Sequence, residues 1–383
     1  MLAAEVRAAL RAVGIDGTRY DRAAFAIKVG FPDGLAAQIY LRTLYAECVR
    51  DPDSRAERIR RFVATFTERA GVPAEWAEVK PLLRPVLRRC MFAQDGPGGA
   101  GTAPLRRPAL PFLDEMVVVD QPTSMAYVND ANRAAWGVAA EEVFAAARAN
   151  LPDWTVESSD LAPDGPLMLQ FVDDGDAYWV SRLLLDGWLA ALAEQVGGRP
   201  VAFAPDVATL VVVGDEPDRL ASVYEQVREE FVEAPRALSP MAYTVDGAGR
   251  VVPYEAPSGH PLTGAVDRAE RVLAAYEYAA QQVLLRADAD EVVASYDVYA
   301  TGEGGTFTVA IWVRGAPTLL PRTDFVGFAE AGVAPFFVPW SAVSEADVLT
   351  ETLEHRPVRY RTSGWPGPTA LGYLREHAVP VQL

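Results

Sequence analysis

The sequence predicts a multi-domain α+β fold with mixed or mainly antiparallel sheets packed against helices. The chain has 383 residues, which is too long for one compact core, so two or three domains are expected. Glycine- and proline-rich breaks at 95–104 and 255–264 divide it. Many short apolar runs follow one another through short turns, and this pattern favours antiparallel or mixed sheets over a doubly wound sheet. We therefore expect three domains, namely a basic domain of a hairpin plus helices over 1–94, a central α+β domain over 105–256 and a C-terminal α+β domain over 262–383.

The first predicted domain opens with a hairpin and continues with helices. The stretch FAIKVGFPDGLAAQIYL, 25–41, has Pro32-Asp33-Gly34 as the turn between two apolar strands. In 51–70, apolar residues recur at helical spacing, which predicts a helix. In PLLRPVLRRCMF, 81–92, we expect a further helix with Arg84 and Arg88 one turn apart. Cys90 is expected to be a buried structural cysteine, with a thiol activated by neighbouring arginines as the alternative.

The central domain is expected to alternate strands and helices. A hairpin joins EMVVVD to SMAYV, and NDANRAAWGVAAEEVFAAARANLP reads as two short helices, the second capped by Asn150. Longer helices are expected at 177–196 and about 216–232. Further strands are predicted at WTVESS, LMLQFV, VAFAP and TLVVVG.

The C-terminal domain is expected to begin with a helix over 265–287. A strand meander follows, with EVVASYDVYA, a GEGG turn and TFTVAIWV, in which Phe307, Val309, Ile311 and Val313 alternate. The segments PRTDFVGFAE and APFFVPW continue the meander.

Charge is unevenly spread along the chain. The formal net charge is −17, yet residues 1–110 carry 18 basic and 12 acidic residues, so the rest has a net charge of −23. An acidic body of this size repels phosphate backbones, which makes nucleic acid an unfavourable partner unless the N-terminal segment acts alone. That alternative requires Arg55, Arg58, Arg61, Arg84 and Arg88 to share one exposed face.

The residue inventory excludes several chemistries and favours a cytoplasmic location. The two cysteines, Cys48 and Cys90, cannot form a disulfide framework. The N-terminal residues lack the apolar core of a signal peptide, and no stretch reaches the ~18 to 20 apolar residues of a membrane span. The three histidines, His260, His355 and His377, fit no zinc motif and cannot form a nucleophile–histidine couple within the central domain. We predict no cofactor and no metal.

The stretch DAYWVSRLLLDGW, 176–188, contains the candidate binding residues Tyr178, Ser181 and Arg182. On a helix over 177–196, Ser181 would lie at the centre of the apolar face, with its hydroxyl bonded to the carbonyl of Ala177. Arg182 would pair with Asp186 on the helix surface, and Asp176 would cap the helix. We interpret the stretch as a structural helix whose polar residues serve packing and capping. The functional alternative is a Mg²⁺ site at Asp173, Asp174 and Asp176.

The central region resembles the YtpQ-like family of bacterial proteins of unknown function. The resemblance is carried by DAYWVSRLL, VAFAPDVATLVVVGD, LSPMAYTVDGAGRVVPY and YVNDANRAAWGVAAEEVFAAARANL, within about 105–256. Val207 and Ala208 follow Asp206, where the family pattern has a polar or basic residue before a second aspartate. The resemblance implies a scaffold and leaves the activity open.

Two hypotheses about function follow. The leading one is a non-catalytic binding or adaptor protein whose acidic surface engages a basic protein partner; a narrower form is an immunity protein that blocks a toxin. The alternative is an enzyme with a carboxylate and arginine site between the central and C-terminal domains, drawing on Asp173, Asp174, Arg182 and His260. The enzyme hypothesis requires these side chains to converge in one pocket.

Overall fold

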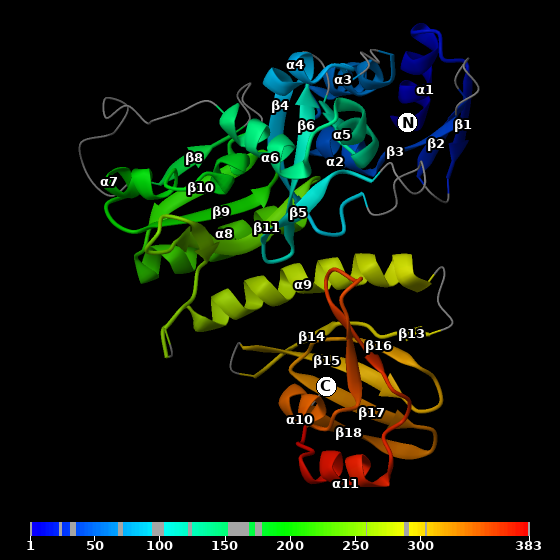
Figure 1. The fold of residues 1–383 in the computed structure, drawn as a ribbon, viewed down its shortest axis with the longest axis vertical. Coiled ribbons are helices and arrows are strands. Elements are labelled where there is room, and N and C mark those ends of the chain that lie inside the picture. The colour runs from blue at the N-terminus through cyan, green and yellow to red at the C-terminus, as the bar shows by residue number, and fades with distance from the viewer. Residues whose placement is uncertain are drawn as a thin grey trace.

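The chain adopts an α+β architecture in which mixed and antiparallel sheets pack against helices (Figure 1). The fold class predicted from the sequence is therefore confirmed. The computed structural model describes residues 2–22, 25–30, 36–67, 72–93, 103–121, 125–151, 168–172, 178–257, 259–286, 291–302 and 305–381. Among the helices of these segments, none combines the length and the apolar character that a membrane span requires.

The N-terminal part packs helices against a small antiparallel sheet of order β1-β2-β3. Its elements are α1 (Leu2–Ala12), β1 (Gly17–Asp21), β2 (Ala26–Gly30), β3 (Ala36–Tyr40), α2 (Arg42–Arg50) and α3 (Arg55–Thr67). The pairing of β2 with β3 confirms the predicted hairpin, whose turn Pro32-Asp33-Gly34 lies outside the described residues. Leu10, Ile27 and Leu41 are fully buried in a core that belongs to this part alone.

A second antiparallel sheet has the order β4-β6-β5, with β7 paired to β6. Its elements and flanking helices are α4 (Trp76–Val79), the 3₁₀ turn η1 (Lys80–Leu82), β4 (Leu83–Arg89), β5 (Arg106–Leu110), β6 (Leu113–Asp120), β7 (Met125–Tyr127), α5 (Asp130–Trp136) and α6 (Ala140–Ala149). The β6–β7 hairpin and the two short helices are as predicted. Asn129 caps α5 through a reciprocal bond pair with Asn132, and Asn150 follows α6 as its C-cap.

The helix expected over 81–92 is wrong, because most of this segment is strand β4. Leu83 and Leu87 lie on one side of the strand and Val86 on the other, and the three are buried in different apolar clusters. Pro85 is tolerated because β4 is an edge strand and needs no hydrogen bond from that position. Strand β4 also pairs along its whole length with β6, so a segment within the range 1–94 completes a sheet of the central region.

The largest core belongs to the antiparallel sheet of order β12-β11-β9-β10-β8. Its elements are β8 (Leu169–Phe171), β9 (Pro200–Asp206), β10 (Thr209–Gly214), α8 (Pro217–Glu233), β11 (Ala237–Val245) and β12 (Val251–Pro253). Helix α8 confirms the predicted helix near 216–232 and buries Leu220, Val227 and Phe231 against the sheet. The strand predicted at WTVESS lies outside the described residues.

The C-terminal part begins with the long helix α9 and continues as two four-stranded sheets, β13-β16-β20-β19 and β14-β15-β17-β18. Its elements are α9 (Thr263–Arg286), β13 (Val292–Val293), β14 (Asp297–Ala300), β15 (Thr306–Val313), β16 (Thr318–Pro321), β17 (Phe325–Glu330), β18 (Val333–Pro339), α10 (Trp340–Glu345), β19 (Leu349–Thr352), β20 (Arg359–Thr362) and α11 (Pro368–Glu376). The pairs β13–β16 and β15–β17 are parallel and the others are antiparallel, so both sheets are mixed.

The buried face of β15 differs from the expected one. Ala310 and Trp312 point into the C-terminal core, whereas Val313 is 43% exposed. Strand β15 lies between β14 and β17 and is covered on both faces, so apolar residues occur on both sides. The alternation of apolar residues alone could not select the core face here.

Helix α9 lies between the central sheet and the C-terminal sheets (Figure 1). On one side, Ala269 and Leu273 belong to the core of the central sheet. On the other side, Tyr278 Oη donates to the carbonyl of Val358 at 2.8 Å and Gln281 Nε2 donates to that of Pro357 at 2.7 Å. The helix therefore joins the two parts.

The fully buried guanidinium of Arg359, on β20, fixes this junction. Its Nε donates to Gln281 Oε1 at 2.6 Å, and its two terminal nitrogens donate to the carbonyls of Ala294, Leu319 and Tyr278. Burial lowers the pKa of Arg359 to about 10, which leaves it charged at neutral pH. These hydrogen bonds offset the desolvation of the buried charge.

Truncation of Arg359 should detach the C-terminal part from α9. Arg359→Ala leaves buried acceptors without a donor, and we expect a loss of at least about 3 kcal/mol in the free energy of unfolding. Arg361→Ala, on the same strand but 44% exposed, should cost less than about 1 kcal/mol. Urea unfolding followed by tryptophan fluorescence measures both, and equal losses for the two variants would contradict the role of Arg359.

Candidate functional site

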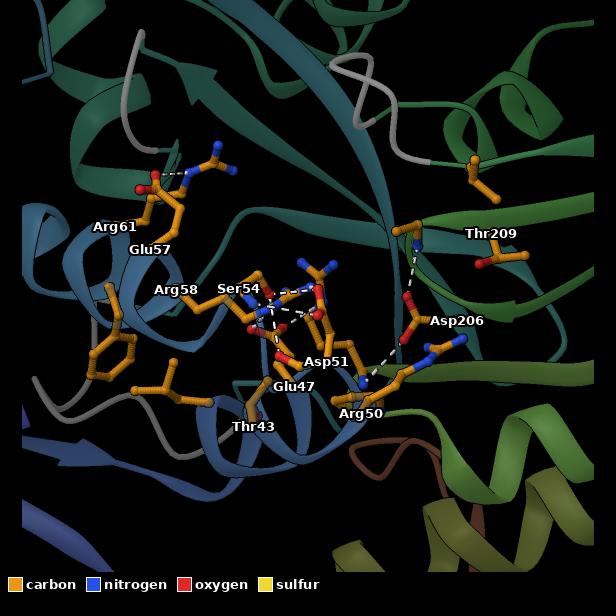
Figure 2. Close-up of a pocket in the computed structure, with 16 residues that line it drawn as sticks. Thr43, Glu47, Arg50, Asp51, Ser54, Glu57, Arg58, Arg61, Asp206 and Thr209 are labelled. Atoms are coloured by element: carbon orange, nitrogen blue, oxygen red, sulfur yellow. Dashed lines mark hydrogen bonds and ion pairs between the residues drawn. The ribbon is translucent and has the colours of Figure 1, made fainter. Parts of the chain in front are cut away.

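A groove of about 1140 Å³ lies between the N-terminal part and the central sheet (Figure 2). Helices α2 and α3 form one wall, and the β9–β10 turn and the segment after α8 form the other. The lining residues are Thr43, Leu44, Glu47, Arg50, Asp51, Ser54, Glu57, Arg58, Arg61, Phe62, Val172, Asp206, Ala208, Thr209, Pro235 and Arg236. Half of them are charged, with four arginines and four carboxylates.

The start of α3 organises the first wall. Ser54 Oγ donates to Asp51 Oδ2 at 2.5 Å, and Arg58 donates both to Ser54 Oγ at 2.7 Å and to Asp51 Oδ2 at 3.3 Å. Aspartate and serine are preferred before a helix because their oxygens accept hydrogen bonds from free backbone N–H groups, and Asp51 Oδ1 accepts from Ser54 N. The hydrogen bond from Ser54, supported by Arg58, holds the pKa of Asp51 below its usual range.

Ion pairs connect the two walls of the groove. Arg236 Nε lies 3.3 Å from Glu47 Oε1, and Arg50 reaches Glu230 of α8 at 3.7 Å. As far as its residues are described, the apolar core of the N-terminal part contains no residue of the central sheet. Polar contacts of this kind are typical of domain interfaces that can move.

Every arginine of the groove is paired with a carboxylate. Besides the two pairs across the groove, Arg58 contacts Glu47 and Asp51, and Arg61 donates to Glu57 at 2.9 Å. The site therefore presents alternating charges of both signs, without an excess of guanidinium groups for a phosphate.

Asp206 lines the groove but serves the backbone. Its two carboxylate oxygens accept from the N–H groups of Ala208 at 2.9 Å and Arg236 at 3.2 Å. These bonds hold the β9–β10 turn against the end of α8. The unusual Val207 and Ala208 after Asp206 thus lie in a turn whose aspartate has a structural partner.

The groove suits recognition of charge better than proton transfer. Among the described residues that line it, there is neither a histidine nor a cysteine. Asp51, with its lowered pKa, is a weak base. Across the described segments, no group of three or more His, Cys, Asp or Glu side chains is arranged to hold a metal ion.

The candidate residues Tyr178, Ser181 and Arg182 lie in the protein interior. Tyr178 packs with Val86 and Met116, Ser181 is 4% exposed, and Arg182 is fully buried. Burial, together with the charge of Asp120, raises the pKa of Tyr178. None of the three lines the groove.

The helix expected over 177–196 is wrong. The segment forms a 3₁₀ turn η3 (Val180–Leu184), a second 3₁₀ turn η4 (Ala190–Leu192) and a short helix α7 (Ala193–Val196). Gly187, at φ +82°, interrupts it. Arg182 therefore lies in the core, with its guanidinium carbon 4.2 Å from the centroid of the Trp179 ring, and not at a helix surface.

The residues of the enzyme hypothesis are not brought together by the structure as far as it describes them. Arg182 is buried, whereas His260 lies in the turn before α9 with its Nδ1 accepting from Leu262 N. Asp173, Asp174 and Asp176 lie outside the described residues, as does Ala177.

The arginines considered for nucleic acid lie on two elements, α3 and β4, and have local partners. Arg55 donates to Glu5, and Arg58 and Arg61 pair with carboxylates in the groove. Arg84 and Arg88 lie on strand β4, where Arg84 donates to the carbonyl of Pro81 and Arg88 to Tyr127 Oη at 2.8 Å. Of the five, only Arg61 is exposed, so the single exposed face that this hypothesis needs is not formed.

Cys90 is a buried thiol beside a buried carboxylate. Its Sγ lies 3.3 Å from Glu277 Oε2, which also accepts from Met91 N at 2.7 Å, while Arg89 lies 3.4 Å from Glu277 Oε1. Burial raises the pKa of Cys90, as does the charge of Glu277. The structural interpretation of Cys90 is supported, and the activated thiol is not.

Sequence reasoning missed the groove itself. Its residues come from α2, α3 and the segments around β9 and β11, far apart in the chain. The Asp-x-x-Ser pattern before α3 was the one local signal, and it indicates a helix start rather than a site.

Comparisons with protein-family models, with curated proteins and with solved structures find no match to this chain.

Glu277 should give the protein a characteristic pH dependence. Burial raises its pKa in the folded state, so the folded protein holds a proton that the unfolded chain releases near pH 4.3. Its contribution to stability therefore falls as the pH rises from about 4. Glutamine does not titrate, so the stability of Glu277→Gln lacks this pH dependence. The free energy of unfolding of the variant minus that of wild type should therefore increase as the pH rises from about 4.

Urea unfolding at a series of pH values tests this expectation. The exposed Glu376→Gln is the matched control for removal of one carboxylate. A constant difference between wild type and Glu277→Gln from pH 4 to 8 would show that Glu277 is ionised throughout.

Proposed function

We propose that the protein is a non-catalytic binding or adaptor protein that docks a basic segment of a partner protein in the groove and along the adjoining face of α8. The observation that carries this proposal is the position of a large charged groove beside an acidic helix face. Small-molecule sites usually enclose about 300–1,000 Å³, whereas this groove has about 1140 Å³ and lies between two domains. Its size supports a polypeptide as ligand.

Helix α8 supplies the acidic face. Asp218, Glu225, Glu229 and Glu233 are exposed and fall on one side of the helix, because their spacing follows the helical repeat. Pro235 and Arg236 follow Ala234, the C-cap of the helix, and line the groove. A basic segment that lies along α8 therefore reaches the groove without leaving the surface.

Charge over the whole chain supports the same partner. The formal net charge of −17 attracts a basic protein over a distance set by ionic strength and accelerates its encounter. The carboxylates Asp51 and Glu57 are 46% and 41% exposed, so they are accessible to basic side chains entering the groove. The free cysteines Cys48 and Cys90 support a reducing, cytoplasmic compartment.

The resemblance of about 105–256 to the YtpQ-like family remains a prediction about the scaffold. The enzyme alternative, with or without Mg²⁺, has no support from the positions of Arg182 and His260. An immunity protein that blocks a basic toxin is the narrower form of the proposal and uses the same surface.

Neutralising the acidic face of α8 should weaken the binding of the partner. The tagged protein is purified from its own host at low salt, and proteins that co-elute stoichiometrically are identified by mass spectrometry. For the partner obtained, the triple variant E225Q/E229Q/E233Q should lose about tenfold in affinity, since each exposed pair contributes up to about 1 kcal/mol. Biolayer interferometry at increasing salt measures the loss.

The matched control is E351Q/E354Q/E376Q, which removes three exposed carboxylates from the C-terminal part. It should leave the affinity unchanged apart from the long-range charge effect. Equal losses for both triple variants, or an affinity independent of salt, would overturn the assignment of this face. A retained small molecule or metal ion, without any protein, would instead favour the enzyme.

A further inference from the structure

A second cavity, of about 440 Å³, lies between α9 and the C-terminal sheets. The opposite side of α9 packs into the core of the central sheet. It is lined by three aromatic rings, by charged side chains and by small polar groups. The lining residues are Phe112, Asp267, Glu270, Arg271, Ala274, Tyr278, Tyr296, Thr308, Arg322, Thr323 and Asp324. Its volume is that of a small-molecule site, and its position at a domain junction is typical of such sites.

The aromatic wall is fixed by packing. The rings of Tyr278 and Tyr296 are stacked, with centroids 5.1 Å apart and an interplanar angle of 17°, and the Phe112 ring meets Tyr278 edge-on at 6.4 Å. Phe112 has a φ of +58°, which a bulky residue rarely adopts. Tertiary contacts therefore hold the β5–β6 turn so that this ring faces α9.

One side of the cavity floor is a satisfied polar network. Asp324 Oδ2 accepts from Thr308 N at 2.8 Å and from Thr308 Oγ1 at 3.0 Å, and lies 3.2 Å from Arg271. Arg271 also donates to Thr306 Oγ1 at 2.9 Å. The charges of Arg271 and Asp324 thus offset one another and leave no net charge on that side.

The other side carries two carboxylates. Asp267 and Glu270 lie one helical turn apart on α9, and both line the cavity. Within the described part of the chain, the ion pairs found on α9 involve its arginines and Glu277, and neither of these two carboxylates. Partial burial and the charge of Asp267 raise the pKa of Glu270, while Arg271 and the exposed Arg322 act in the opposite direction.

We propose that this cavity binds a small organic cation, an amine on a flat apolar body. The ammonium group would lie between Asp267 and Glu270, and the apolar body would lie against Tyr278, Tyr296 and Phe112. Carboxylates supply charge-assisted hydrogen bonds to an ammonium, and aromatic rings bind cations and flat groups. After the pairing of Arg271 with Asp324, two carboxylates face one arginine, so the cavity keeps a net negative charge that a monocation neutralises.

Three ligands of similar shape and different charge separate the contribution of charge to binding from that of apolar contact. Titration calorimetry with the full-length protein compares benzylamine, benzyl alcohol and benzoate. Benzylamine should bind with a dissociation constant below about 1 mM, which is within reach of an eight-atom ligand. Benzyl alcohol and benzoate should bind at least tenfold more weakly. Absence of benzylamine binding, or equal binding of the three, would overturn the proposal.

Two variants assign the binding to this cavity. Glu270→Gln should raise the dissociation constant of benzylamine at least tenfold. Tyr296→Ala should weaken the binding of every ligand that binds. Glu376→Gln, an exposed carboxylate on α11, is the control and should leave the dissociation constant unchanged. Glu270 is itself exposed at the cavity mouth, so its variant should fold, and circular dichroism checks this. An affinity insensitive to Glu270→Gln would place the ligand elsewhere.

Charge coupling gives an independent readout. Because the pKa of Glu270 is raised, benzylamine should lose affinity as the pH falls toward that pKa, and the loss should be smaller in Glu270→Gln. No protein partner takes part in these measurements. The result therefore does not depend on the function proposed for the groove.

Discussion

The buried guanidinium of Arg359 holds the C-terminal part to the rest of the chain. A charge in the interior is costly unless its donors are bonded. Here they meet a glutamine and a carbonyl of α9, the carbonyl of Ala294 just after β13 and the carbonyl of Leu319 on β16. The bonds require α9 and both strand segments to be in register. The position of α9 depends on this arrangement, and so do the features built on α9.

Helix α9 shows how one element can serve two cores. Its apolar residues complete the core of the central sheet, while Tyr278 and Gln281 bond to the loop before β20. Glu277, on the same helix, accepts from Met91 N, just after β4. The cavity of Asp267 and Glu270 lies where α9, the C-terminal strands and Phe112 of the β5–β6 turn meet.

The groove follows from a different balance of forces. The N-terminal part has its own core, and its contacts with the central region include ion pairs such as Arg236–Glu47 and Arg50–Glu230. Exposed pairs of this kind contribute little stability, so they can be exchanged for contacts with a partner. In contrast, the buried pairs of Glu115 with Arg107 and Arg148 are suited to hold β6 to its neighbours.

The sequence by itself determined the α+β class, the β2–β3 and β6–β7 hairpins, and helices α3, α5, α6, α8 and α9, because each depends on local periodicity, capping or turn residues. It could not determine the state of 81–92 or 177–196, where apolar runs fit helix and strand equally and burial on several sides decides. The groove and the cavity could not be predicted from the sequence either. Their side chains come from distant segments, and only the tertiary structure decides which charges meet, which are paired and which are left facing a cavity.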